Sequence, residues 1–183
     1  MARHGRTAWN AAGRYQGHAD IPLDSTGEGQ ADELARALAP LEPVLVVSSD
    51  LQRARCTAAA LAARAGIELR VDPRLREVDV GAWEGLTPEE AETRFPTEYA
   101  AWRAGEDVPR GGGETRRQAG TRAAAALLEH ARAVGPGDRL VAVSHGMVLR
   151  AAVRSLRAGG WTDLAEDPPH LGNVGWMEMS VLL

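Results

Sequence analysis

Hydrophobic residues recur with helical spacing in the first part of the chain and then give way to an unbroken apolar run. Positions 31, 34, 35 and 38 follow the three-and-four spacing of one helix face, which predicts a helix over residues 26–39 that ends before Pro40. Residues 44–47, Val-Leu-Val-Val, are typical of a strand that is covered on both faces.

The same alternation of helix and strand patterns continues along the chain. Thr87, Pro88 and Glu90 predict a helix start, with threonine as N-cap, proline in the first turn and glutamate closing a capping box. The other predicted helices span residues 51–65, 115–134 and 147–158, and the other strands span residues 67–71, 139–143 and 174–183. The predicted loops span residues 5–25, 75–86 and 105–113.

Strands that alternate with helices predict an α/β fold, a three-layer αβα sandwich with a mostly parallel central sheet. In such sheets ligands bind beyond the carboxyl ends of the strands. Three polar segments fall at these ends: residues 3–5 (Arg-His-Gly), 48–53 (Ser-Ser-Asp-Leu-Gln-Arg) and 144–146 (Ser-His-Gly). We therefore expect two histidines and two arginines to meet in one crevice.

Length and composition limit the class of protein. The 183 residues, 44% hydrophobic and 25% charged, predict one globular domain over residues 1–183. No apolar run approaches the roughly 20 residues of a membrane span, and no secretory signal pattern opens the chain. A single cysteine, Cys56, fits a cytoplasmic location. The net charge of −4 argues against binding to nucleic acid, although all 21 basic residues are arginine.

The predicted crevice has the residue types that hold and attack a phosphoryl group. A neutral imidazole is a nucleophile for phosphorus when one ring nitrogen donates to a carbonyl and the other stays free. Guanidinium groups bind two phosphoryl oxygens at once. A carboxyl group can supply the proton that a leaving oxygen needs, and by position alone Glu77, Asp79 and Glu84 are all candidates.

Five ordered segments, over nearly the whole chain, resemble the motifs of the histidine phosphatase superfamily, the phosphoglycerate mutase-like proteins. They are residues 3–10, 16–23, 48–58, 75–85 and 144–146. The resemblance implies the family's α/β fold, a phosphatase that acts through a phosphohistidine, and no metal or other cofactor. Among phosphatases, the glucosyl-3-phosphoglycerate phosphatase group is most similar at residues 48–51, 75–77, 83–87 and 172–173 and at Trp176. This resemblance implies a small anionic substrate such as a sugar phosphate or a phosphoglycerate derivative.

The resemblance also implies a role for each residue of the crevice. His4 would be the nucleophile, and Glu77 would be the general acid in preference to its two neighbours. The other catalytic residues would be Arg3, Arg53 and His145, and the substrate-binding residues would be Asn10, Gln16, Gly17 and Gly146.

Further residues could contribute to the crevice. Packing in the core or against helices is the expected role of the tryptophans, and a place in a substrate subsite stays open for one of Trp83 and Trp102. His18 and His170 lie on predicted loops that could reach the pocket mouth, whereas His130 lies on a predicted helix and is expected to be exposed.

The sequence departs from the family pattern in two places. Only two residues precede the Arg-His-Gly motif, so the family's central first strand is missing or much shortened. Arg6 stands where mutase-type members often have glutamate, and it would add positive charge beside the site. Residues 86–113 are shorter than the basic insert of a mutase and hold only Arg94, Arg103 and Arg110, which favours a phosphatase.

Three alternatives stay open. The first is a phosphoglycerate mutase-type transfer with the same machinery. The second is a metal-dependent hydrolase that uses His4 and His145, although the sequence offers no closely spaced third ligand. The third is a non-catalytic module that binds phosphorylated ligands, against which His4 and Glu77 argue. The physiological substrate is not fixed by the sequence, and a homodimer remains open.

Overall fold

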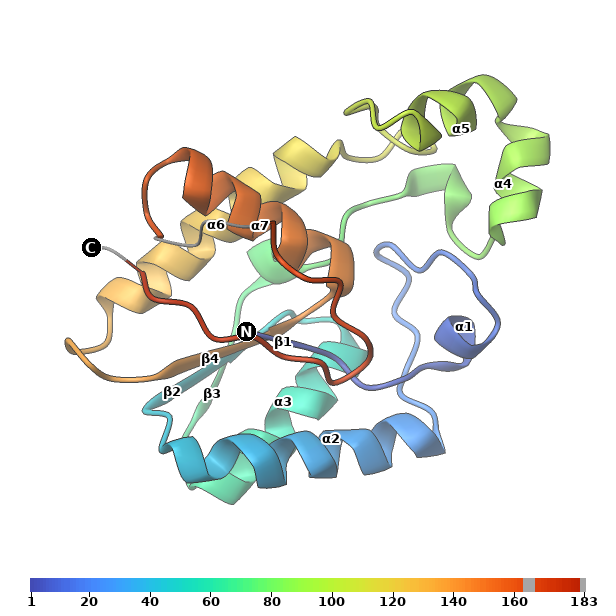
Figure 1. Ribbon diagram of the computed structural model, residues 1–183. Helices are drawn as coiled ribbons and strands as arrows, with labels where there is room; N and C mark the ends of the chain where they lie inside the picture. Colours follow the sequence, from blue (N-terminus) through green and yellow to red (C-terminus); the bar gives the residue numbers. More distant parts are fainter. Residues whose placement is uncertain (163–166, 182–183) are drawn as a thin grey trace.

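A parallel four-stranded sheet forms the centre of this computed structural model (Figure 1), which describes residues 1–162 and 167–181. The strand order is β1-β4-β2-β3, and each neighbouring pair of these strands is parallel. The strands are β1 (Ala2–Arg3), β2 (Leu45–Ser48), β3 (Leu69–Val71) and β4 (Leu140–Ser144).

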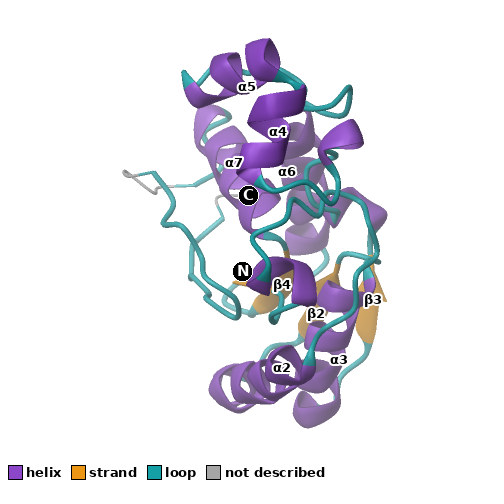
Figure 2. Ribbon diagram, turned by 90° about the vertical axis from the view of Figure 1, so that its right-hand side faces the viewer, coloured by secondary structure: helices purple, strands orange, loops and turns teal. Residues whose placement is uncertain are grey.

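Helices cover both faces of the sheet. In Figures 1 and 2, α2 and α3 lie on one face, and α6 and α7 lie on the other. The fold is therefore the three-layer αβα sandwich that the sequence predicts. No helix in the described ranges is long and apolar enough to cross a membrane. The helices are α1 (Ala8–Ala11), α2 (Ser25–Leu38), α3 (Gln52–Ala65), α4 (Pro88–Arg94), α5 (Pro96–Arg103), α6 (Arg116–Arg132) and α7 (Gly146–Ala158).

Side chains of the two inner strands alternate between the two helix layers. Val46 of β2 and Val141 and Val143 of β4 pack in one core cluster with α2 and α3. Val47 and Ala142 lie in the other cluster, with α6 and α7. Both strands are thus covered on both faces, which explains why the sequence shows continuous apolar runs there.

Most predicted helices agree with the structure to within one or two residues. The helix predicted over residues 26–39 is α2, and it begins at Ser25 because the Asp24 side chain accepts a hydrogen bond from Gly27 N at 2.8 Å. The capping box predicted at Thr87 is present at the start of α4.

Two segments predicted as loops contain short helical turns. Residues 5–25 include α1, for which Thr7 is the N-cap. Residues 75–86 include a 3-10 turn at Gly81–Trp83. A single turn is too short to show hydrophobic periodicity, so the pattern of apolar residues could not reveal it.

The strand predicted over residues 174–183 is wrong for the part of that segment that the structure describes. The chain runs antiparallel beside β1, where Arg3 N donates to Gly175 O at 3.0 Å, but it forms only an isolated bridge. Val174 has a φ of 52°, which interrupts an extended conformation. Because no strand forms there, the short β1 is an edge strand of the sheet instead of a central strand. Residues 182–183 lie outside the described residues.

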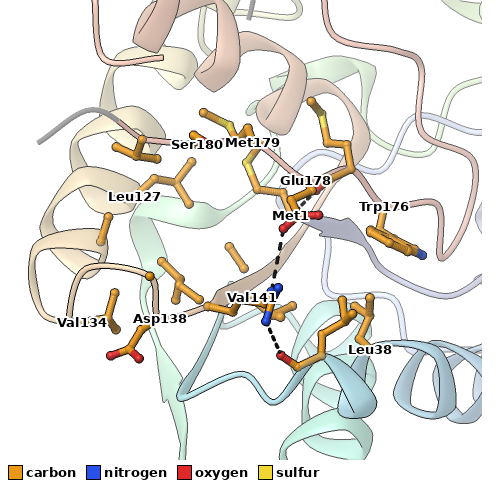
Figure 3. Close-up of a pocket in the computed structure, with 18 of the residues that line it drawn as sticks. Met1, Leu38, Leu127, Val134, Asp138, Val141, Trp176, Glu178, Met179 and Ser180 are labelled. Atoms are coloured by element: carbon orange, nitrogen blue, oxygen red, sulfur yellow. Dashed lines mark hydrogen bonds and ion pairs between the residues drawn. The ribbon is translucent and has the colours of Figure 1, made fainter. Parts of the chain in front are cut away.

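A cavity of about 630 Å³ lies at the amino end of β4 and is bordered by α6 and the C-terminal segment (Figure 3). Its lining is mostly apolar and includes Leu127, Val141 and Met179, and its charged side chains are Asp138, Arg139 and Glu178. None of the predicted site residues lines this cavity. With two acids and one base around it, the cavity is poorly suited to an anionic substrate.

Candidate active site

A second, smaller pocket of about 180 Å³ lies at the carboxyl ends of the strands. The chain segments that leave β1, β2 and β4 meet there, as expected for ligand sites in parallel sheets. Four arginines and one carboxylate border it. The lining residues are Arg3, His4, Asn10, Arg14, Tyr15, Gln16, Gly17, Arg53, Glu77, Gly146, Met147, Arg150 and His170.

His4 directly follows β1 and is 2% exposed. Its Nδ1 lies 2.6 Å from the carbonyl oxygen of Gly5, which can only accept, so Nδ1 carries the proton. Nε2 is then left with a lone pair and makes no hydrogen bond within the described part of the chain. Burial lowers the pKa of His4 well below its usual value, and the charge of Arg53 lowers it further. The ring is therefore neutral near pH 7.

His145 has the opposite arrangement of ring nitrogens. Its Nδ1 lies 3.2 Å from Nε of Arg53, which can only donate, so the proton of the neutral ring is on Nε2. Nε2 is buried and has no hydrogen-bond partner among the described residues. Burial, followed by the charge of Arg53, lowers the pKa of His145 well below its usual value. A donor without a partner therefore lies beside His4, with the two ring centroids 5.0 Å apart.

The two predicted arginines reach the pocket from different elements. Arg53, on the first turn of α3, is fully buried, and its Nη1 and Nη2 donate to the carbonyl oxygens of Ala19 (2.6 Å) and Gly17 (2.9 Å). Burial lowers its pKa to about 10, so it stays charged at neutral pH. Arg3 donates through Nη1 to Leu171 O at 2.9 Å. Its Nε is buried without a hydrogen-bond partner in the described ranges.

Close backbone packing fixes the loop that follows His4. A Cβ on Gly5 would collide with the carbonyl oxygen of Gly27, at the start of α2. Gly5 N also donates to Thr57 Oγ1 of α3 at 3.0 Å. Only glycine fits after the histidine, because the backbone of α2 comes so close there. The loop is thereby held with the carbonyl oxygen of Gly5 against Nδ1 of His4.

Glu77 is held at the start of α7. Its Oε1 accepts hydrogen bonds from Val78 N (2.9 Å) and Val148 N (2.8 Å), and its Oε2 accepts one from Met147 N (3.2 Å). The other two candidate acids do not line the pocket. Glu84 accepts from the backbone of residues 18–19, and Asp79 accepts from Gly81 N, so both brace loops.

The predicted substrate-binding residues also lie at this pocket. Asn10 Oδ1 accepts from Thr7 N at 3.1 Å, and its Nδ2 makes no hydrogen bond within the described residues. Gln16 Oε1 accepts from Thr7 Oγ1 at 3.0 Å. Gly17 has a φ of +51°, and a Cβ there would crowd Glu84 and Val80, so this position requires glycine. Gly146 begins α7 beside Arg3.

Arg6 and the two tryptophans lie outside the pocket lining. Arg6 does not line the pocket; its Nε donates to Asp24 at 2.9 Å and its Nη2 donates to Thr26 Oγ1 at 2.8 Å. Trp83 and Trp102 do not line it either. Trp83 is fully buried among the rings of Tyr15, Phe95, Tyr99 and Trp102, so apolar burial determines its position.

The three remaining histidines have different positions. His170 lines the pocket, as its loop position allowed. His18 does not, because its Nε2 lies 2.9 Å from Glu77 O. His130 was expected to be exposed, but its side chain is only 14% exposed, because its Nε2 lies 2.9 Å from Asp72 Oδ2.

Sequence reasoning missed four pocket residues: Arg14, Tyr15, Met147 and Arg150. A signal existed for the last two. A helix that starts at residue 146 repeats every 3.6 residues, so positions 146, 147 and 150 share one face. Arg14 and Tyr15 follow α1 in a loop whose path no periodicity predicts.

Among the described residues, no group of three or more His, Cys, Asp or Glu side chains could hold a metal ion. His4 and His145 therefore have no third protein ligand in that part of the chain. Both rings instead have a hydrogen-bonding partner on Nδ1. The donor set of the pocket, arginine and imidazole with one carboxylate, suits an anion better than a cation.

Known proteins resemble this chain in sequence and in structure. The histidine phosphatase superfamily (branch 1) matches residues 1–180. Glucosyl-3-phosphoglycerate phosphatase from Mycobacterium tuberculosis is 36% identical over 98% of this chain and 83% of that protein. Metal-independent phosphoserine phosphatase from Arabidopsis thaliana is 36% identical over 97% of this chain and 77% of that protein. The structure of mycobacterial glucosyl-3-phosphoglycerate phosphatase with VO3 has a TM-score of 0.83, with 34% identity over 95% of this chain and 86% of that chain.

Proposed function

Because the chain belongs to the histidine phosphatase superfamily, we propose that it hydrolyses small anionic phosphomonoesters through a phosphohistidine on His4. The observation that carries this proposal is the state of the His4 ring. Its Nδ1 proton is engaged by Gly5 O, its pKa is lowered, and its Nε2 has no partner among the described residues. A neutral imidazole with a free lone pair, in a pocket that holds four arginines, is a nucleophile facing an anion site.

In the first step Nε2 of His4 forms a bond to phosphorus while the ester P–O bond breaks. Arg3 Nε and His145 Nε2, two buried donors without partners in the described chain, would bind the phosphoryl oxygens as charge develops. The leaving oxygen takes a proton from Glu77. In the second step water attacks phosphorus, Glu77 accepts its proton, and His4 leaves as a neutral ring.

The charge of Arg53 supports the same proposal. Its guanidinium is already tied to Gly17 O, Ala19 O and His145, so it is held rigidly beside both histidines. The positive charge opposes protonation of each ring, which keeps the nucleophile neutral, and it attracts the phosphoryl group. Arg53 would thus act on the nucleophile and the anion together.

The proposed substrate is a sugar phosphate or a phosphoglycerate derivative. Two similar proteins are named for glucosyl-3-phosphoglycerate and phosphoserine, which are both phosphomonoesters with a carboxylate. A pocket of about 180 Å³ fits the phosphoryl group and a short carbon skeleton, with any larger substituent lying toward solvent. Glucosyl-3-phosphoglycerate is therefore one candidate within this class.

Hydrolysis is favoured over a mutase reaction by the positions of the three arginines in residues 86–113. A mutase must retain its phosphorylated product, but Arg94 and Arg103 do not line the pocket. Arg110, the third arginine of this segment, is buried and stacked on Trp102, with its guanidinium carbon 5.8 Å from the ring centroid. No residue of this segment closes over the pocket to exclude water.

The proposal is tested by rapid quench with 32P-labelled 3-phosphoglycerate in the presence of a chelator. We expect protein-bound label that is labile to acid and stable to alkali, together with release of inorganic phosphate. His4→Ala should abolish the label and lower kcat by roughly 10³-fold or more, whereas His130→Gln, remote from the pocket, should retain both. Label on serine, cysteine or aspartate, or loss of activity with the chelator, would refute the mechanism; label returned to the glycerate would identify a mutase.

A further inference from the structure

The pocket holds more positive charge than a phosphoryl group requires. Arg3 and Arg53 lie beside His4, where the phosphoryl group would bind. Two further arginines, Arg14 and Arg150, line the same pocket, and among the described residues Glu77 is the one carboxylate of the lining. Either these two arginines are neutralised by neighbouring acids, or they are available to a second anionic group of the substrate.

Arg14 is neutralised within the protein. Its Nη1 donates to Glu90 Oε2 at 2.9 Å and also to the carbonyl oxygen of Gly85. Glu90 is itself fixed by the capping box of α4, where its Oε2 accepts from Thr87 N. This ion pair therefore ties α4 to the loop after α1, which is a structural role.

Arg150 has no comparable partner. Among the described residues its ion-pair partner is Asp167, at 3.9 Å, which also pairs with Arg154 at 2.6 Å and with Arg157 at 3.3 Å. Asp167 is thus shared, and its contact with Arg150 is the longest of the three. The Nε of Arg150 is buried and has no hydrogen-bond partner in the described part of the chain. Of the two arginines outside the phosphoryl site, Arg150 is therefore the one whose charge and donors are less satisfied by the described residues.

His170 also lines the pocket, on a segment that is tied to the phosphoryl site. The next residue, Leu171, accepts the hydrogen bond from Arg3 Nη1 at 2.9 Å. Asn173 Nδ2 donates to His4 O at 3.1 Å and to Asn10 Oδ1 at 3.2 Å. His170 is consequently positioned by the same residues that surround the nucleophile, although it is exposed.

We infer that Arg150 and His170 form a subsite for a carboxylate that the substrate carries in addition to its phosphoryl group. Arg150 lies four residues after Gly146 on α7, so their Cα atoms are about 6 Å apart along the helix axis. That rise is comparable to the length of a three-carbon skeleton. The subsite therefore selects phosphomonoesters that bear a carboxylate a few bonds from phosphorus, over phosphomonoesters that lack one.

This inference rests on the proposed function and narrows its substrate class. The test compares 3-phosphoglycerate with glycerol 3-phosphate, which has the same carbon number but a hydroxymethyl group in place of the carboxylate. We expect the parent protein to have a higher kcat/KM for 3-phosphoglycerate. Arg150→Met should lower kcat/KM for 3-phosphoglycerate by about 10-fold or more and change that for glycerol 3-phosphate much less, because the lost contact is to the carboxylate alone.

The matched control is Arg117→Met, at the exposed start of α6, which removes an equal charge and an ion pair, to Asp107, at a residue that does not line the pocket. It should leave the ratio of the two kcat/KM values unchanged. His170→Gln should lower the ratio in the same direction as Arg150→Met. A ratio that Arg150→Met does not change, or that Arg117→Met changes equally, would overturn the subsite.

Calorimetric binding of the same two compounds to the parent protein separates this inference from the proposed function. Tighter binding of 3-phosphoglycerate, weakened by Arg150→Met, would support the subsite even if no phosphate were released. Equal affinities for both compounds would overturn it whether or not the protein is a phosphatase.

Discussion

His4 and His145 lie with their rings 5.0 Å apart, yet their neighbours give them opposite hydrogen-bonding states. A carbonyl oxygen faces Nδ1 of His4, and a guanidinium faces Nδ1 of His145. The first ring therefore offers a lone pair on Nε2, and the second offers a proton on Nε2. At the residue scale, the sequence predicted which histidines meet, but the state of each ring depends on one neighbouring atom that only the three-dimensional structure identifies.

Arg53→Lys should lower kcat/KM by at least about 10-fold, or roughly 1.4 kcal/mol. Lysine keeps the charge, but its single nitrogen cannot donate to Gly17 O, Ala19 O and His145 Nδ1 from one plane as Arg53 does. The measurement is steady-state kinetics on 3-phosphoglycerate. Arg55→Lys, on the exposed side of the same helix, is the control and should match the parent. Parental activity in Arg53→Lys would show that the planar guanidinium is not needed.

Glu77→Gln should slow 3-phosphoglycerate far more than p-nitrophenyl phosphate. An alkoxide needs the proton of the acid and p-nitrophenolate leaves nearly unaided, so a loss of ~10²–10⁴-fold should appear selectively for the first substrate. If the substitution disturbs the three backbone N–H groups that donate to Glu77, activity should fall equally for both substrates.

The control for that prediction is Glu84→Gln. Glu84 uses only Oε1 to accept from the backbone of residues 18–19, and a glutamine carbonyl oxygen can take over that role. Activity on both substrates should therefore be retained. An equal loss on both substrates in Glu77→Gln would remove Glu77 as the acid.

At the scale of secondary structure, the sequence predicted the elements with strong periodicity or caps and missed those without them. α2, α3, α6 and α7 carry long apolar faces, and each was placed to within about two residues. The short turn α1 was missed although it brings Asn10 to the pocket. The last predicted strand failed: Val174 adopts a positive φ, and the described residues after it form only an isolated bridge to β1, which an apolar sequence pattern does not reveal.

A pair of threonine caps tests whether α1 positions the site. Thr7 and Thr115 each form a capping box, at the starts of α1 and α6. Replacing either by alanine should cost about 1 kcal/mol of unfolding free energy. Thr7→Ala should also lower kcat/KM, because the Thr7 hydroxyl lies within hydrogen-bond distance of both Asn10 Oδ1 (3.1 Å) and Gln16 Oε1 (3.0 Å) and helps to hold these side chains. Thr115→Ala should leave kcat/KM unchanged, and the same result for Thr7→Ala would mean that α1 has no positioning role.

At the scale of the whole molecule, the parallel topology explains why residues far apart in sequence form one site. β1, β4 and β2 are neighbours, so the segments that follow them meet at one edge of the sheet. The alternation of strands and helices in the sequence is enough to predict that these segments meet. The outer part of the pocket could not be predicted in this way. Arg150 and His170 come from a helix face and from an irregular segment, whose placement depends on tertiary contacts such as Arg3 Nη1 to Leu171 O.

Burial of two neutral histidines also makes the stability of the whole protein depend on pH. The pKa values of His4 and His145 are lowered well below 6.5 in the folded state, mainly by burial. The unfolded chain therefore binds more protons than the folded chain below pH 6.5, so the free energy of unfolding must fall as pH falls through this range. Each histidine contributes up to about 1.4 kcal/mol per pH unit, or about 2.7 for the two together.

Urea unfolding between pH 5.0 and 6.0 measures this slope. Above that window the amino group of Met1, whose pKa burial lowers to about 6, adds its own dependence. Below it, carboxylates with lowered pKa values begin to contribute, Asp72 at about 2 among them. His4→Asn should reduce the slope by about one proton, because asparagine does not titrate in either state. A parent protein whose unfolding free energy is constant from pH 5.0 to 6.0 would show that both rings bind protons in the folded state, and His4 would then lack the neutral lone pair that the proposed nucleophile requires.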